Sequence, residues 1–102
     1  MCMKLLNLLG LAQRAGKLQS GDFIVEKALK AKTVKLLLLA GDAGPNNEKK
    51  YKQLAESHGV ELRIVSTKEN LGHAIGKEIR VVIAVNDEGF SQSLMKVIDQ
   101  DN

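Results

Sequence analysis

The chain has 102 residues, enough for one domain (1–102) with a single modest core. Hydrophobic residues make up 44% of it and charged residues 26%, which is the balance of an ordinary globular protein. One cysteine, Cys2, excludes a disulfide scaffold, and two histidines make a structural zinc site unexpected. Three aromatic residues argue against an interface built on rows of stacking rings.

The net charge of +3 is unevenly distributed along the chain. Residues 1–40 hold seven Lys and Arg against Asp22 and Glu26, a net +5, whereas the remainder is net −2. A basic half suits an anionic partner, most commonly a nucleic acid, and a solvated charged helix face is the equally weighted alternative. No apolar run reaches the roughly 18–20 residues of a membrane span, so we expect a cytoplasmic protein with no membrane partner.

The first forty residues predict two helices and a buried strand. Apolar residues at helical spacing over 5–12 predict an amphipathic helix that ends at Gly16, and an extended piece follows over 17–20. Ser20 is expected to cap the second helix, and the apolar run over 34–40 predicts a strand that is buried on both faces. The expected apolar face of the second helix consists of Ile24, Val25, Ala28 and Leu29.

The rest of the chain alternates in the same way. Gly44-Pro45 predicts a turn before a polar helix that Gly59 closes, and Ser66 to Glu69 match the S-x-x-E pattern that caps a helix. The predicted helices cover 46–58, the segment after Ser66 as far as Ala74, and 91–98, and the predicted strands cover 60–64 and 79–85. Helices that alternate with short strands predict an α/β protein, a three-layer sandwich with helices on both faces of a small sheet.

Motifs for catalysis or cofactor binding are weak. A phosphate loop has four residues between its first glycine and a Gly-Lys pair, but five residues separate Gly10 from Gly16-Lys17 and three separate Gly72 from Gly76-Lys77. Neither pair is followed by the Ser or Thr that binds the metal. No dinucleotide fingerprint occurs, so no small-molecule cofactor is expected. His58 and His73 are expected to be structural or surface residues, and no carboxylate pair or metal ligand set is recognisable, so we expect no enzyme activity and no metal.

One segment with the features of a nucleic-acid contact starts at Gly21. The free N–H groups of a first helical turn favour phosphate oxygens, and Lys27, Lys30 and Lys32 extend positive charge along the same helix. A glycine that only permits a tight turn is the alternative explanation.

The second such segment covers residues 71–80. Gly72 and Gly76 flank a turn of small residues, and such a loop is able to press its backbone and Ile79 against a partner. Lys77 and Arg80 are then placed to contact phosphates. Close packing between helix and sheet explains the same glycines without a ligand.

Several short motifs occur together in a fixed order. They are 9–18, Gly21 with Val25 and 27–28, 38–40 with 42–43, 71–72 with Ala74 and 76–78, and 86–90. In this order and spacing, from residue 5 to 94, the chain resembles the ribosomal-protein family that binds kink-turn RNA, the archaeal "L-seven-Ae" type. It is most similar to the small bacterial branch of YlxQ-like proteins.

The resemblance implies a four-stranded mixed sheet inside an α-β-α sandwich, and RNA binding without catalysis or cofactor. The implied partner is a structured RNA, ribosomal RNA above all, with ribosome-associated proteins as further partners. The resemblance and the pattern of charges and glycines together give the expected RNA-binding residues, which are Gly21, Lys27, Lys30, Lys32, Gly76, Lys77, Glu78, Ile79 and Arg80.

Two positions depart from the pattern of the kink-turn binders. Those proteins carry Asn and Glu two and three residues after the glycine, where this chain has Phe23 and Ile24. A protein-interaction module that uses both as an apolar patch is therefore the main alternative. A free-standing relative of the substrate-recognition domain of RNA 2′-O-methyltransferases is the third hypothesis.

Overall fold

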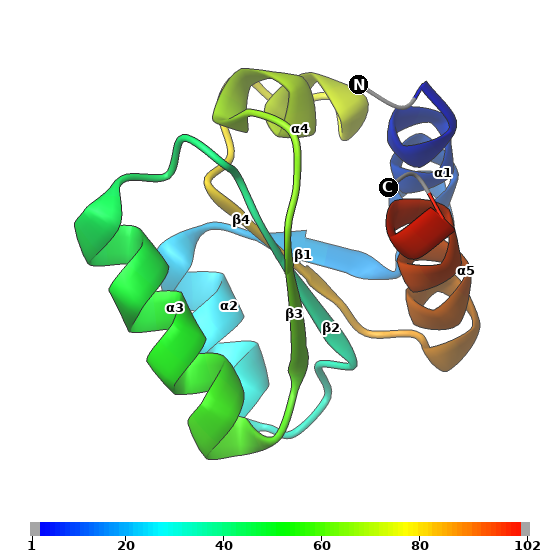
Figure 1. The fold of residues 1–102 in the computed structure, drawn as a ribbon. Helices are drawn as coiled ribbons and strands as arrows, with labels where there is room; N and C mark the ends of the chain where they lie inside the picture. Colours follow the sequence, from blue (N-terminus) through cyan, green and yellow to red (C-terminus); the bar gives the residue numbers. More distant parts are fainter. Residues whose placement is uncertain (1–2, 101–102) are drawn as a thin grey trace.

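The computed structural model describes residues 3–100 (Figure 1), so Cys2 lies outside the described residues. Helices and strands alternate as the sequence predicts. In chain order they are α1 (Met3–Arg14), β1 (Leu18–Ser20), α2 (Asp22–Lys30), β2 (Leu36–Leu39), α3 (Pro45–His58), β3 (Glu61–Ile64), α4 (Lys68–Ala74), β4 (Val82–Val85) and α5 (Glu88–Gln100).

The sheet is four-stranded and mixed, in the order β1-β4-β2-β3. β2 and β3 are parallel, whereas β4 runs antiparallel to both β1 and β2. β1, β2 and β3 therefore point the same way, and their carboxyl ends meet the beginning of β4 at one edge. We call this the carboxyl edge, and we call the opposite one the amino edge.

Strand β2 joins the two halves of the core. Its four leucines are all buried and alternate between the faces of the sheet. Leu36 and Leu38 pack on the side of α1, α4 and α5, and Leu37 and Leu39 pack on the side of α2 and α3 (Figure 1). Each fully buried leucine contributes about 1.5–3 kcal/mol. The predicted three-layer sandwich and the doubly buried strand are confirmed.

Some predicted boundaries and caps are wrong by one to three residues. Strand β4 begins at Val82 rather than residue 79, because residues 75–81 form a loop that leads into it. Helix α5 begins at Glu88 rather than residue 91, because the Asp87 carboxylate accepts a hydrogen bond from the Phe90 N–H at 2.8 Å. The cap of α4 is Thr67, whose hydroxyl accepts from the Asn70 N–H at 3.1 Å, and not Ser66.

Helices α1 to α4 all end in the same backbone motif. The first or second residue after the helix takes a left-handed conformation, and two N–H groups bond back to carbonyls three and five residues earlier. After α4, for example, Gly76 N donates to His73 O and Lys77 N donates to Gly72 O. The left-handed residues are Gly16, Lys32, Gly59 and Gly76. The two Gly-Lys pairs are therefore helix ends.

Gly72 packs too closely against the loop after α4 to tolerate a side chain. An added Cβ would lie 2.2 Å from the Glu78 carbonyl oxygen. We predict that Gly72→Ala lowers the free energy of unfolding by about 2 kcal/mol, as overpacking does. Gly10→Ala is the matched control, because its Cβ would lie 3.4 Å from the Ala74 carbonyl oxygen. Urea unfolding measures both, and equal stability of the two variants would contradict the prediction.

Candidate nucleic-acid interface

Three helices start at the carboxyl edge. α2, α3 and α4 each follow a strand that ends there, so their N-terminal ends share this edge (Figure 1). Helix N-termini carry partial positive charge, and open α/β sheets bind ligands beside the carboxyl ends of their strands. The edge is therefore electrostatically suited to an anion.

The first turn of α2 has no side-chain cap. Gly21 occupies the capping position with φ 98° and ψ 141°, a conformation that favours glycine, and the first helical hydrogen bond runs from Val25 N to Gly21 O. The N–H groups of residues 22–24 make no hydrogen bond within residues 3–100. Ser20, the expected cap, lies in β1 instead. The prediction of Ser20 as cap is wrong, and the first turn is left open to a ligand.

Arg80 holds the loop of residues 75–81 against this helix start. Its Nε donates to the Ser20 hydroxyl at 3.0 Å, and its Nη1 donates to the Ile79 carbonyl at 2.7 Å. Its backbone N–H bonds the Lys68 carbonyl at 2.9 Å. The structure therefore brings together the two segments that the sequence singled out, although Arg80 and Ser20 are 60 residues apart.

The loop presents charged and apolar side chains outward. Lys77, Glu78 and Ile79 are all exposed, whereas Arg80 is half-buried by its contacts. No ion pair within residues 3–100 engages Lys77. Gly76 is exposed and follows α4, and its φ of 75° favours glycine there.

Both acidic residues of α2 bond to α3. The Asp22 carboxylate accepts a hydrogen bond from the Tyr51 hydroxyl, and Glu26 pairs with Lys50 at 3.0 Å. The Lys50 ammonium also lies 5.2 Å from the centre of the Tyr51 ring. We call these four residues the α2–α3 clamp. No local sequence pattern could pair Tyr51 with Asp22, 29 residues away.

The remaining lysines follow α2 away from the carboxyl edge. Lys27, Lys30 and Lys32 are exposed, and no ion pair among the described residues involves them. The nine residues of α2 span about 13 Å, at about 1.5 Å each, so Lys32 lies at the amino edge, far from Gly21. The structure therefore does not bring Lys32 together with the loop of residues 75–81.

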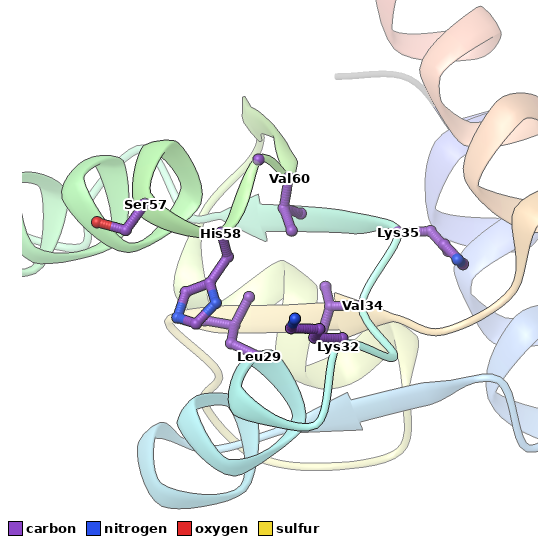
Figure 2. A pocket seen from close by; sticks show the side chains of 8 residues that line it. Leu29, Lys32, Val34, Lys35, Ser57, His58 and Val60 are labelled. Carbon is purple, nitrogen blue, oxygen red and sulfur yellow. The ribbon is translucent and has the colours of Figure 1, made fainter.

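A pocket of about 470 Å³ lies at the amino edge, between the ends of α2 and α3 (Figure 2). In Figure 2, Lys32 lies beside Val34, whereas Lys35 extends away from His58. Helix C-termini present carbonyl groups, which favour cations such as Lys32 and disfavour anions. The pocket has no acidic lining residue. Its lining residues are Leu29, Lys32, Val34, Lys35, Ser57, His58, Gly59 and Val60.

Residues 3–100 contain no cluster of three His, Cys, Asp or Glu side chains that could hold a metal ion. Over the same residues, no helix has both the length and the apolar character to cross a membrane.

Three large apolar side chains are exposed at or beside the first turn of α2. Phe23 is 80% exposed, Ile24 is 49% exposed, and Ile79 in the adjacent loop is 52% exposed. The expectation that Ile24 belongs to the buried face of α2 is wrong, because Val25, Ala28 and Leu29 alone turn toward the sheet. Phe23 and Ile24 are therefore exposed, as the protein-interaction hypothesis requires.

Comparisons with known proteins agree with this fold. The chain matches the Ribosomal protein L7Ae/L30e/S12e/Gadd45 family over residues 3–95. It is 42% identical to the RNA-binding protein YlxQ of Bacillus subtilis (strain 168) over 92 residues, which cover 90% of this chain and 92% of that protein. The resemblance that the sequence motifs indicated, including the YlxQ-like branch, is confirmed.

Two solved structures share the architecture. A protein from Bacillus halodurans, described as having unknown function, gives a TM-score of 0.90 at 44% identity and covers 94% of this chain and 97% of its own. The Giardia lamblia 15.5kD RNA binding protein gives a TM-score of 0.78 at 19% identity and covers 96% of this chain and 84% of its own, which shows the same fold.

The α2–α3 clamp predicts an unusual alkaline titration. Burial, reinforced by the Asp22 carboxylate, raises the pKa of Tyr51 above its ordinary value of 10.0. The resulting stabilisation is complete below pH 10 and is lost as the pH rises further. Tyr51 is the only tyrosine, so absorbance near 295 nm reports it alone. We expect no tyrosinate in the folded protein at pH 10–11.

The Tyr51→Phe variant provides the comparison. We expect its free energy of unfolding at neutral pH to be about 1 kcal/mol lower than that of the wild type, the value of one hydrogen bond. We also expect its stability not to show the additional decline above pH 10. A folded wild-type protein whose tyrosine titrates with a midpoint near 10 would contradict both expectations.

Proposed function

Because this chain belongs to the ribosomal protein L7Ae/L30e/S12e/Gadd45 family, we propose that it is a non-enzymatic RNA-binding protein. The observation that carries the proposal is the uncapped start of α2, which Arg80 joins to the loop of residues 75–81. The name of the Bacillus subtilis relative supports RNA as the ligand. The proposed target is a structured RNA, a kink-turn in ribosomal RNA, bound in the cytoplasm in connection with translation.

The proposed contacts divide into two groups by position. At the carboxyl edge, the N–H groups after Gly21 and the ammonium of Lys77 bind phosphates, and Ile79 packs on an unstacked base. Glu78 accepts hydrogen bonds from base amino groups or ribose hydroxyls. Arg80 supports the loop through Ser20 and adds positive charge. Gly76 ends α4 and so sets the path of this loop.

The second group lies along α2. Lys27, Lys30 and Lys32 reach phosphates of an RNA helix that runs from the carboxyl edge toward the amino edge. Because the α2–α3 clamp binds both acidic residues of α2, these lysines face the RNA without an ion-pair partner. Lys27, the nearest to the helix start, contributes most.

A protein-interaction module on the same fold is the second candidate function. The exposure of Phe23 and Ile24, at positions where kink-turn binders carry polar residues, favours it. Such an interface depends on apolar contact, so its affinity changes little with salt.

A titration against two RNAs tests the proposed function. We expect a labelled kink-turn RNA to bind more tightly than the same RNA with its G·A pairs replaced by Watson–Crick pairs. Both affinities should fall steeply between low and moderate salt, as expected for roughly four to six phosphate contacts. Equal, salt-sensitive affinity for both RNAs would exclude kink-turn specificity, and no binding to either would favour the protein-interaction module.

Charge reversal locates the interface. We expect Lys27→Glu and Lys77→Glu each to weaken RNA binding by about tenfold. Each should also reduce the slope of log affinity against log salt concentration by roughly the contribution of one phosphate contact. Lys96→Glu is the matched control, because Lys96 is an exposed lysine of α5 on the other face of the sheet. If all three variants bind RNA as tightly as the wild-type protein does, the interface lies elsewhere.

A further inference from the structure

Phe23 is exposed without any reason in the fold. It is the second residue of α2 and is 80% exposed, the highest value among the exposed large apolar residues within 3–100. The apolar face of α2 is complete without it, because Val25, Ala28 and Leu29 are buried against the sheet. Folding therefore does not use the ring, which remains available to a ligand.

The surroundings of Phe23 combine donors and cations. Lys27 lies four residues further along α2 and so on the same helix face. The N–H groups of the first turn have no acceptor within residues 3–100, and Arg80 holds the loop bearing Lys77 beside Ser20. An aromatic ring among phosphate-binding groups is the arrangement that binds a nucleotide by stacking and by its backbone.

The first turn of α2 is also held in place. The Asp22 carboxylate, next to Phe23 in sequence, accepts a hydrogen bond from the buried Tyr51. This bond directs the negative charge toward α3. It also fixes the backbone from which the Phe23 ring projects, so less conformational freedom is lost when a ligand binds.

We propose that Phe23 stacks on an unpaired RNA base at this interface, which rests on the proposed function of RNA binding. One ring, rather than a row of aromatic residues, contacts one base. Because every base has a π-face, the contact tolerates any of the four bases but requires that the nucleotide be unpaired. Phe23 thus replaces recognition of base edges by recognition of an extruded base.

The exposed apolar area argues for a base rather than a protein partner. Phe23, Ile24 and Ile79 are three separate side chains on a short helix turn and a loop. Cations without ion-pair partners lie beside them, at Lys27 and Lys77. The cores of protein interfaces are depleted of charge, whereas nucleic acids need it.

A double-mutant cycle between protein and RNA tests the stacking. The probe is a fluorescein-labelled RNA hairpin with a three-nucleotide bulge beside tandem G·A pairs, together with three versions in which one bulge nucleotide is abasic. We expect Phe23→Ala to weaken binding to the parent hairpin roughly tenfold. One abasic RNA should weaken binding of the wild-type protein similarly, yet bind the Phe23→Ala variant no worse than the parent hairpin does.

The Phe23→Trp variant adds a direct signal. The chain contains no tryptophan, so fluorescence from this variant reports position 23 alone. We expect the variant to bind the parent hairpin as tightly as the wild type, with quenched emission, and we expect the quenching to disappear with the critical abasic RNA. For the Phe23→Ala variant, Leu11→Ala is the matched control, because Leu11 is a 51% exposed apolar residue of α1, on the other face of the sheet.

The outcomes separate the two proposals. Salt-sensitive RNA binding that is unchanged in Phe23→Ala overturns the stacking and leaves the proposed function intact. Additive effects of Phe23→Ala and every abasic RNA overturn it as well. Absence of RNA binding by the wild type overturns the proposed function. Emission of the Phe23→Trp variant that shifts to the blue with protein concentration, without RNA, assigns position 23 to a protein contact instead.

Discussion

The position of β4 determines the arrangement of the whole molecule. Its four residues are buried on both faces, and it runs antiparallel to both β1 and β2, between them. Because β2 and β3 are parallel, three strands must end where β4 begins. The helices that follow these strands start at the same edge, and the loop of residues 75–81 must return to it in order to enter β4. The candidate interface is a consequence of this strand order.

Electrostatics at that edge depend on contacts made inside the sandwich. α2 carries three cations and two acidic residues in or just after the helix, and both acids are bonded to α3 by Tyr51 and Lys50. The clamp therefore does two things at once. It fixes α2 against α3 on one face of the sheet, and it leaves the exposed side of α2 with a larger share of positive charge than its composition suggests.

The sequence was sufficient for the elements and the class of fold, because periodicity and apolar runs are local. The four leucines of β2 and the glycine that closes α3 are examples. The cap assignments failed for two different reasons. Ser20 lies in β1, where its hydroxyl accepts a hydrogen bond from Arg80, and Thr67 rather than Ser66 accepts from the N–H of Asn70. The pairs Asp22–Tyr51 and Ser20–Arg80 could not be predicted, because the partners are 29 and 60 residues apart. The outward direction of Phe23 and Ile24 likewise depends on how α2 packs on the sheet.

The register between β1 and β4 has a consequence for biosynthesis. Leu18 pairs with Val85 and Ser20 pairs with Ile83, so these contacts join segments that are far apart in the sequence. Contacts of such high sequence separation form late, and a growing chain cannot form them until residue 85 has left the ribosome. Until then, β1 has no strand to pair with, and Arg80 cannot bond to Ser20 beside the start of α2. The interface therefore cannot form before β4 has left the ribosome, and a shorter nascent chain cannot present it.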